Sequence, residues 1–446
     1  MIASPARPDT RFRPSESVAR DLAGRFGTPL YVVDEAHLRG RLREYREAFA
    51  AAWPHSELNF ASKANSTLAL LKIAYEEGCR IDVASEGEFR AALAAGVPAE
   101  ACHLHGNNKS EAEIAFAVER GIGHIVADHL LELDLIADAL KTHPGETKVV
   151  IRLAPGVDPV THAKISTGQS DTKFGFNIVD GSADQALARA MELGLPVIGF
   201  HCHVGSQLLD PEAQRSGGAL IAEFARRAET EHGFRTSYLN VGGGLGVRYT
   251  DADDPMPIAE YNRLVCDAVR AALGRDDLTL GQEPGRSLVA ESGVTLYSVG
   301  VVKTVPTKGG TRTYAAVDGG LSDNPRPALY GSKYTVERVA RKEGWTYVTD
   351  GPGAAMGAID EGDAPFTVAG RHCETDRLFE DVDLPADLAR GDLLQVLCTG
   401  AYNSSMASNY NRYPRPAVAL LPIEGEPRLI ARRDTYDEMF AREVEL

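Results

Sequence analysis

The regular alternation of strand and helix patterns constrains the fold of this chain more than any other feature. We predict eight strands, with helical segments in most of the gaps between them, near residues 58–62, 80–84, 102–105, 123–127, 148–153, 197–203, 237–241 and 278–283. This alternation predicts an α/β fold in the form of a (β/α)8 TIM barrel. An open doubly wound sheet is the alternative, but the dinucleotide fingerprint G-x-G-x-x-G does not follow the first strand.

The chain changes character after Glu291. Short β-rich runs, separated by glycine, proline and aspartate turns, occur at 295–305, 313–317, 366–369, 393–398 and 416–421. They predict a second, mainly β domain. We therefore expect a barrel over residues 35–290, a β-rich C-terminal domain over 291–446, and an N-terminal extension over 1–34 whose strand joins the β domain.

Charge and composition limit the classes of partner. The net charge of -16 at pH 7 argues against nucleic acids and anionic membranes, because both attract a positive protein face. A small molecule is the expected partner. No apolar run approaches the roughly 20 residues that span a bilayer, and the first residues lack the apolar core of a signal peptide, so we expect a cytoplasmic protein. The six cysteines contain no C-x-x-C pair, which indicates neither a zinc site nor a disulfide framework.

Lys63 lies where the first barrel strand ends and a helical segment over 66–77 begins. The carboxyl ends of barrel strands carry the catalytic residues of such folds. With Phe60, Ala61 and Ala64 beside it, its amine is expected to be partly desolvated, which would lower its pKa and make it a nucleophile for a Schiff base. By itself, the pattern also fits a solvated lysine at a strand end.

The loops after the last two barrel strands suit a phosphate group. Gly242, Gly243 and Gly244 follow the seventh strand, and Arg286 follows the eighth. Successive glycines let backbone amides approach an anion closely. An arginine in the neighbouring loop can neutralise a phosphate or bind a substrate carboxylate. A flexible turn is the alternative interpretation of the glycine run alone.

His201 and His203 end the sixth strand. Residues at i and i+2 point the same way from a strand, so a metal pair must be considered. No third ligand with suitable spacing stands out, and we predict no metal site. An imidazole that faces the barrel mouth could instead stack on an aromatic cofactor, with Ser206 donating a hydrogen bond to a phosphate.

Lys63, a stacking histidine, a phosphate-binding loop and Glu283 together predict pyridoxal 5'-phosphate as the cofactor. That cofactor needs a lysine for its aldehyde, an anion site for its phosphate and a partner for its ring nitrogen. Glu283 would keep the ring nitrogen protonated. A protonated ring accepts electrons from a carbanion at the α-carbon of an amino acid.

The chain resembles the diaminopimelate decarboxylases, which are barrel-fold (fold type III) decarboxylases that use pyridoxal phosphate. The matching segments occur in the family's order over most of the chain and lie at 60–65, 82–88, 105–110, 165–169, 173–176, 201–207, 242–244, 283–286, 326–330, 373–374, 400–402, 408–411 and 415–416. The resemblance implies a TIM barrel followed by a mainly β domain of the type that alanine racemase and these decarboxylases share.

The resemblance also implies roles for individual residues. Lys63 would bind the cofactor covalently, His203 would stack on its ring, and Glu283 would bind the ring nitrogen. Asp82 would lie beside the cofactor and orient its neighbours. The residues that would hold the phosphate are Ser206, Gly243, Gly244 and Tyr402.

In families of this kind the second domain pairs with a partner barrel, so the resemblance implies a homodimer with shared active sites. Cys373 and Glu374 would then reach the active site of the other subunit. After carbon dioxide leaves, Cys373 would protonate the α-carbon as a general acid. Lys63 is the alternative proton donor.

The residues assigned to the far end of the substrate indicate diaminopimelate. Arg286, Arg326 and Tyr330 match the family's clamp for a distal carboxylate. Glu374 matches its acceptor for a distal ammonium group, and Tyr402 is assigned to the substrate as well. Two guanidinium groups without an acidic partner suit a carboxylate better than the ammonium end of ornithine or lysine. One arginine could instead hold the cofactor phosphate or a structural carboxylate.

We therefore predict a carboxy-lyase of lysine biosynthesis that converts meso-diaminopimelate to L-lysine and carbon dioxide. Two segments depart from the family pattern. The family usually continues its cysteine motif as Cys-Glu-Ser-Gly-Asp, whereas this chain reads Cys373-Glu374-Thr375-Asp376-Arg377, and the segment 351–357 matches no family motif. These differences leave open a paralogous decarboxylase of another amino acid in a specialised pathway.

Two further functions are alternatives. A barrel-fold amino-acid racemase needs a tyrosine base and an arginine beside the ring nitrogen, where this chain has Cys373 and Glu283. A non-catalytic regulatory homologue would be expected to lose the lysine, the cysteine or the phosphate glycines. All of these are present in this chain, which favours the enzyme.

Overall fold

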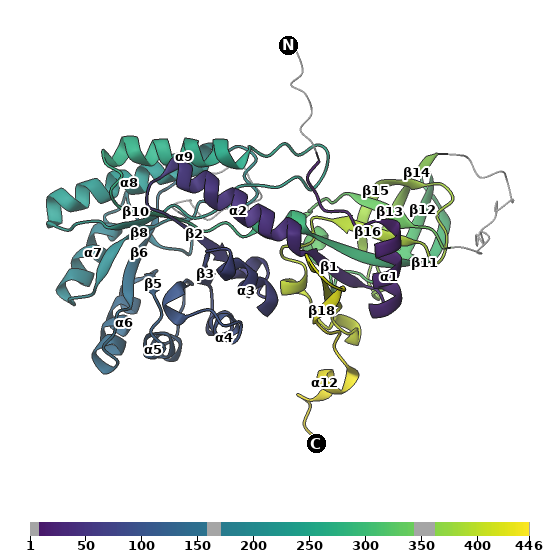
Figure 1. Ribbon diagram of the computed structural model, residues 1–446, viewed down its shortest axis with the longest axis horizontal. Coiled ribbons are helices and arrows are strands. Elements are labelled where there is room, and N and C mark those ends of the chain that lie inside the picture. Colours follow the sequence, from purple (N-terminus) through teal and green to yellow (C-terminus); the bar gives the residue numbers. More distant parts are fainter. Residues whose placement is uncertain (1–8, 158–170, 343–361, 446) are drawn as a thin grey trace, which may run out of the picture. The chain divides into compact units, whose positions relative to one another are not determined.

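The computed structural model describes residues 9–157, 171–342 and 362–445. The chain forms two compact units (Figure 1). The first, here named the barrel unit, consists of Arg39–Val247 and Asp254–Leu288. The second, here named the β unit, consists of Met1–Leu38, Arg248–Asp253 and Val289–Leu446.

Eight parallel strands close on one another in the barrel unit, and β10 pairs with β2 to complete the circle. In spatial order they are β2 (Ser56–Ala61), β3 (Arg80–Val83), β4 (Cys102–Leu104), β5 (His124–Ala127), β6 (Lys148–Ala154), β8 (Val197–His201), β9 (Tyr238–Asn240) and β10 (Thr279–Gln282). The predicted barrel strands and the (β/α)8 fold are confirmed. A short additional strand, β7 (Phe176–Asn177), pairs with β6.

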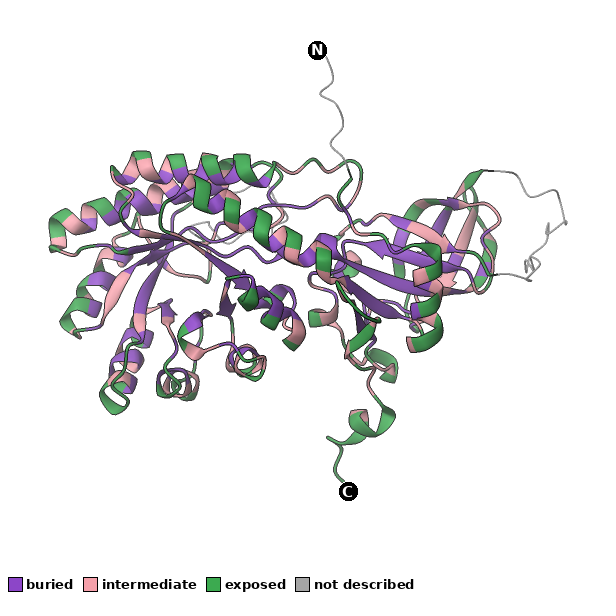
Figure 2. Ribbon diagram, in the orientation of Figure 1, coloured by how far each residue is buried: buried purple, intermediate pink, exposed green. Residues whose placement is uncertain are grey.

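Helices surround the barrel strands (Figure 1). They are α2 (Glu35–Ala52), α3 (Leu68–Glu76), α4 (Glu86–Ala94), α5 (Glu111–Glu119), α6 (Leu130–Thr142), α7 (Ser182–Glu192), α8 (Glu212–His232) and α9 (Ile258–Leu273). Figure 2 shows that these helices turn a buried side toward the strands and an exposed side outward, as amphipathic spacing predicts. Side chains fix where some of them begin, since Ser85 caps α4 and Ser110 forms a capping box with Glu113 on α5.

The barrel strands are covered on both faces and therefore read as nearly continuous apolar runs, such as Val149, Val150 and Ile151 in β6, which are fully buried. Buried polar side chains interrupt these runs at Asp82 in β3 and at His201 in β8. A buried polar or charged group is costly without a partner, so these interruptions indicate where to look for a functional site.

The β unit contains a sheet in which nine strands are described. They are β1 (Leu30–Asp34), β11 (Gly293–Thr307), β12 (Gly310–Val317), β13 (Val336–Ala340), β14 (Asp363–Ala369), β15 (Arg377–Pro385), β16 (Leu393–Leu397), β17 (Ala417–Leu421) and β18 (Arg428–Ala431). The N-terminal strand β1 pairs antiparallel with β11 and parallel with β17. The predicted mainly β character is confirmed, although the sequence does not predict β13, β15 and β18, because charged residues interrupt their apolar pattern.

Four further α-helices are found in the described part of the chain. They are α1 (Glu16–Phe26), α10 (Arg286–Val289), α11 (Arg326–Tyr330) and α12 (Tyr436–Phe440). None of the helices within 9–157, 171–342 and 362–445 is both long enough and apolar enough to cross a membrane.

Candidate active site

Lys63 lies directly after β2, as the sequence predicts. The strand ends at Ala61, and the short 3-10 helix η1 (Ser62–Ala64) turns the chain toward α3. Phe60 and Ala64 are buried, but Lys63 itself is exposed. The prediction of a partly desolvated amine is therefore wrong, because the turn of η1 carries this side chain out of the packed layer. An exposed amine at the end of a barrel strand remains open to reaction with an aldehyde.

Glu283 follows β10 and is buried among polar groups from neighbouring strand ends. His201 Nε2 donates to Glu283 Oε1 at 2.8 Å, and Asn240 Nδ2 donates to Glu283 Oε2 at 3.3 Å. Burial favours the neutral acid, but the imidazoles of His201 and His105 hold the pKa of Glu283 well below its usual value. Glu283 is therefore a carboxylate that stays ionised inside the barrel.

Asp82 is the second carboxyl group of this cluster. Its Oδ1 lies 3.5 Å from His105 Nε2, and the same nitrogen lies 3.5 Å from Glu283 Oε2. Burial raises the pKa of Asp82 well above its usual value, and the charge of Glu283 raises it further. Asp82 therefore holds the proton of the pair, and Glu283 holds the charge.

His201 and His203 do not form the metal pair considered from the sequence. Because β8 ends at His201, the alternation of a strand does not extend to His203. The Gly243 N–H donates to His203 Nδ1 at 3.3 Å, whereas His201 contacts Glu283. Burial lowers the pKa of His203 to about 3, and the charge of Lys63 acts in the same direction. The His203 ring is therefore neutral and is fixed by a backbone amide.

The glycine run after β9 packs too closely for any side chain. A Cβ atom on Gly242 would lie 2.5 Å from the Cys202 carbonyl oxygen, and one on Gly243 would lie 2.4 Å from the Glu283 carbonyl oxygen. Gly242 also has a φ of +76°, which side chains disfavour. The interpretation of this run as a flexible turn is wrong, because the backbones of neighbouring barrel loops meet here and only glycine fits.

Ser206 and Arg286, from the loops after β8 and β10, contact each other. Arg286 Nε and Nη2 lie 3.2 and 3.1 Å from Ser206 Oγ, and Arg286 is buried. A buried guanidinium beside a hydroxyl group is a strong anion-binding arrangement. This contact favours the alternative in which Arg286 helps to bind a phosphate.

The carboxyl ends of the barrel strands thus gather the barrel part of the predicted site. It comprises Lys63, Asp82, His203, Ser206, Gly243, Gly244, Glu283 and Arg286, and the structure adds His105 and His201. These residues fit pyridoxal phosphate. Lys63 offers an exposed amine, the buried Arg286 beside Ser206 offers hydrogen-bond donors to a phosphate, and Glu283 offers an ionised carboxylate for a protonated ring nitrogen.

The sequence assigns no role to His105, and it considers His201 only within the pair with His203, as a metal ligand or as a ring that stacks on a cofactor. Their contacts join strand ends that are far apart along the chain, so no local pattern reveals them. Two segments singled out in the sequence, 165–169 and 351–357, lie outside the described residues.

Arg326, in the β unit, is a buried cation among aromatic rings. Its Nε donates to Tyr334 Oη at 2.8 Å, and the rings of Tyr330 and Tyr402 lie 5.2 and 5.4 Å from its guanidinium carbon. Within the described ranges, no carboxylate forms an ion pair with it. A buried guanidinium without a carboxylate partner is costly, and it favours the arrival of an anionic group.

Cys373 and Glu374 lie on an exposed loop of the β unit. The Cys373 N–H donates to Asn411 Oδ1 at 3.0 Å, and Tyr410 Oη donates to the Glu374 carboxylate. All six cysteines of the chain are described, and Cys373 alone is exposed. This distinguishes Cys373 from the other thiols, which are buried.

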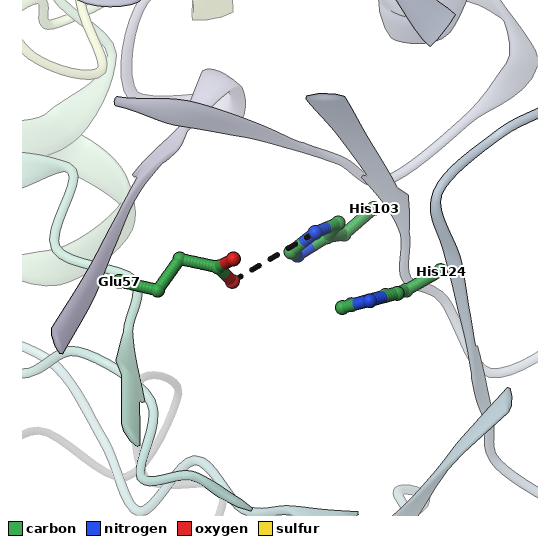
Figure 3. A group of neighbouring side chains, drawn as sticks. All are labelled: Glu57, His103 and His124. Atoms are coloured by element: carbon green, nitrogen blue, oxygen red, sulfur yellow. Dashed lines mark ion pairs between the residues drawn. The ribbon is translucent and has the colours of Figure 1, made fainter. Parts of the chain in front are cut away.

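A second polar cluster lies nearer the amino ends of β2 and β5 (Figure 3). The ligand atoms of Glu57, His103 and His124 lie within 4.8 Å of one another, which is close enough to consider a metal ion. However, Arg80 Nε lies 2.5 Å from Glu57 Oε2, and Tyr238 Oη donates to Glu57 Oε1 at 2.9 Å. The two imidazole rings stack with centroids 4.1 Å apart and planes inclined by 22°, so their in-plane lone pairs do not converge on one point. We therefore interpret the cluster as a polar layer of the barrel core.

Known proteins resemble the chain over nearly its whole length. Residues 35–290 match the family model of the pyridoxal-dependent decarboxylase, pyridoxal binding domain. The chain is 42% identical over 428 residues to the diaminopimelate decarboxylase of Bacillus subtilis, which covers 94% of this chain and 92% of the relative.

Solved structures show the same similarity. The crystal structure of diaminopimelate decarboxylase from M. jannaschii in complex with L-lysine has a TM-score of 0.84 and 31% identity, covering 98% of this chain and 97% of that chain. The Helicobacter pylori enzyme complexed with L-lysine has a TM-score of 0.82 and 30% identity, covering 95% of this chain and 98% of that chain. The predicted family, fold and cofactor class are confirmed. The chain belongs to the diaminopimelate decarboxylase family of pyridoxal-phosphate-dependent carboxy-lyases.

Proposed function

We propose that this protein decarboxylates meso-diaminopimelate to L-lysine with pyridoxal phosphate as its cofactor. Its family membership supports the reaction. The observation that carries the proposal is the ionised Glu283, held by His201 at 2.8 Å inside the barrel. A carboxylate at this place suits a protonated cofactor ring, and a protonated ring suits the loss of a carboxylate as carbon dioxide.

When bound, the cofactor supplies an electron-withdrawing ring that takes up the electrons of the bond to the departing carboxylate. Glu283 would pair with the ring nitrogen and keep its proton in place. An arginine at this position, which a racemase of this fold needs, would leave the nitrogen unprotonated. Glu283 therefore favours decarboxylation over racemisation.

The remaining barrel residues would hold the cofactor. We assign Lys63 to its covalent attachment and His203 to the face of its ring, since the neutral imidazole is fixed by the Gly243 N–H. Asp82 would orient His105, which lies 3.5 Å from both Asp82 Oδ1 and Glu283 Oε2. The residues assigned to the phosphate are Ser206, Gly243, Gly244 and Tyr402, with Arg286 as a further donor to this group.

Arg326 would select the substrate. Its buried guanidinium lacks a carboxylate partner among the described residues, and Tyr330 lies beside it, so a distal carboxylate would complete its environment. The family resemblance assigns Arg286 and Tyr402 to the same substrate. Because Arg286 already donates to Ser206, we propose Arg326 as the main determinant of specificity.

Two residues of the β unit would complete the reaction. Glu374 would accept the distal ammonium group of the substrate. Cys373, the one exposed thiol, would deliver the proton to the α-carbon after carbon dioxide has left. Lys63, once released from the cofactor, is the alternative donor.

A direct test supplies the purified holoenzyme with meso-diaminopimelate, L-lysine or L-ornithine and follows carbon dioxide release. We expect release from diaminopimelate alone. Release from only a monocarboxylate would overturn the assignment of Arg326 and favour a paralogue with another substrate. Exchange of the α-proton without carbon dioxide release would favour a racemase and overturn the proposed reaction.

A homodimer with shared active sites and a cytoplasmic location belong to the same proposal, and both come from the sequence and the family resemblance. Light scattering coupled to size-exclusion chromatography should give twice the chain mass of 47.9 kDa. Mixing a Lys63→Ala protein with a Cys373→Ala protein should restore activity through hybrid dimers if the sites are shared. Two inactive variants that never complement each other would refute the shared site.

A further inference from the structure

The loop over residues 370–376, here named the Cys373 loop, departs from the family pattern at its base. Its acid stands one place earlier than usual, at Asp376, and no glycine precedes it. Asp376 is buried, while Cys373 and Glu374 are exposed. Asp376 also has a φ of +38°, a conformation that glycine adopts freely and other residues adopt at a cost.

The Asp376 carboxylate accepts hydrogen bonds from a donor outside the loop and from donors within it. Its Oδ1 accepts the Leu321 N–H at 3.0 Å. Its Oδ2 lies 2.8 Å from His372 Nδ1 and also accepts the His372 backbone N–H at 3.3 Å. Because a carboxylate can only accept here, His372 Nδ1 carries the proton. The Gly370 N–H donates to the Asp376 carbonyl oxygen at 2.8 Å, which closes the loop at its base.

Two glycines make room for this carboxylate. A Cβ atom on Gly370 would lie 1.9 Å from Asp376 Oδ2, and one on Gly320 would lie 2.3 Å from it. Neither position could carry a side chain without displacing Asp376. The carboxylate therefore occupies a space that fits it closely.

His372 links this carboxylate to the residues that hold the tip of the loop. Its ring stacks on Tyr410, with centroids 5.6 Å apart and planes inclined by 11°. Tyr410 donates to the Glu374 carboxylate, and the adjacent Asn411 accepts the Cys373 N–H at 3.0 Å. The buried base and the exposed tip of the loop are thus fixed by one connected set of contacts.

We propose that Asp376 is a positioning residue that holds Cys373 and Glu374 in their working geometry through His372 and Leu321. In the usual family motif a glycine precedes the acid, whereas here Asp376 itself has the positive φ and supplies the carboxylate. The proposal rests on the proposed function, since it concerns the placement of the general acid and the ammonium acceptor.

The test compares the wild-type holoenzyme with Asp376→Asn. Asparagine keeps the shape but replaces one acceptor oxygen with a donor, which opposes either the Leu321 N–H or the two N–H groups of His372. We expect the amides of residues 321 and 370–373 to exchange hydrogen at least about tenfold faster. The kcat should fall about 100-fold, because a displacement of about 1 Å can cost that much. The dissociation constant of the cofactor should not change, since neither Asp376 nor its partners His372 and Leu321 are among the residues assigned to the cofactor.

Asp381→Asn is the matched control, because Asp381 is exposed and also has a positive φ, +55°. It should leave exchange and kcat unchanged. Gly370→Ala disturbs the same contact, because its Cβ atom would displace the Asp376 carboxylate. It should give the faster exchange and the lower kcat expected for Asp376→Asn, and it serves as the test if Asp376→Asn folds poorly. Normal kcat in both Asp376→Asn and Gly370→Ala, or a loss of cofactor affinity equal to the loss of kcat, would overturn the proposal. If the wild-type protein releases no carbon dioxide, the proposed function fails while the exchange measurement still decides whether Asp376 fixes the loop.

Discussion

The stacked pair His103 and His124 predicts a defined loss of stability in acid (Figure 3). Burial lowers the pKa of each ring from 6.5 to about 3. The charge of Arg80 disfavours the protonated rings further. Both rings are therefore neutral in the folded protein throughout the range in which histidines of an unfolded chain become charged.

The sign of the effect follows from this difference. In the unfolded chain each histidine binds a proton as the pH falls through 6.5, while the folded protein binds it only near pH 3. The contribution of each neutral ring to stability is therefore complete above pH 6.5 and is lost as the pH falls toward 3. One pKa unit is worth about 1.4 kcal/mol, so each histidine should lower the free energy of unfolding by about 2 kcal/mol at pH 5.

Urea unfolding of the wild type and of His103→Gln, at about pH 7.5 and about pH 5, measures this contribution. Glutamine keeps a polar side chain but cannot be charged. The free energy of unfolding of the variant should therefore fall by about 2 kcal/mol less than that of the wild type between the two pH values. His55→Gln, at an exposed position, should leave the difference unchanged. If the free energy of unfolding falls equally in the wild type and in His103→Gln between the two pH values, the folded protein protonates this ring without cost, and the reasoning is refuted.

Three further predictions concern the site. Gly243→Ala places a Cβ atom 2.4 Å from the Glu283 carbonyl oxygen, so the dissociation constant of the cofactor, measured by fluorescence titration, should rise about 100-fold. Unchanged affinity would contradict the close approach of the Gly243 and Glu283 backbones. Arg326→Lys loses the planar guanidinium, so kcat/KM for diaminopimelate should fall about 100-fold while cofactor affinity stays constant. An equal fall in kcat/KM and in cofactor affinity would indicate a structural role for Arg326. Cys373→Ala should lower kcat by about 10²-fold or more with the cofactor still bound, and normal turnover would remove this thiol from the mechanism.

Local patterns in the sequence determined the framework of the site. Strand and helix spacing predicts the eight barrel strands, and with them the position of Lys63 after β2 and of the glycine run after β9. These features depend on neighbouring residues along the chain, because strand ends, turns and amphipathic faces are local properties. The functional residues that lie at such ends could therefore be named from the sequence.

The tertiary structure decided which of these residues meet. Closure of the sheet through the pairing of β10 with β2 brings Glu283 into a cluster with Asp82, His105 and His201. Strand alternation alone placed His201 beside His203, but β8 ends at His201 and sends the two rings to different partners.

The tertiary structure also decided which of these side chains are buried. The sequence suggested a desolvated Lys63, whereas the turn after β2 exposes it. It treated Asp376 as a departure from a motif, whereas the fold encloses its carboxylate between two glycines and His372. Contacts of this kind join segments far apart along the chain, and their energies depend on how closely the backbones approach and on how much water they exclude, which only the folded arrangement fixes.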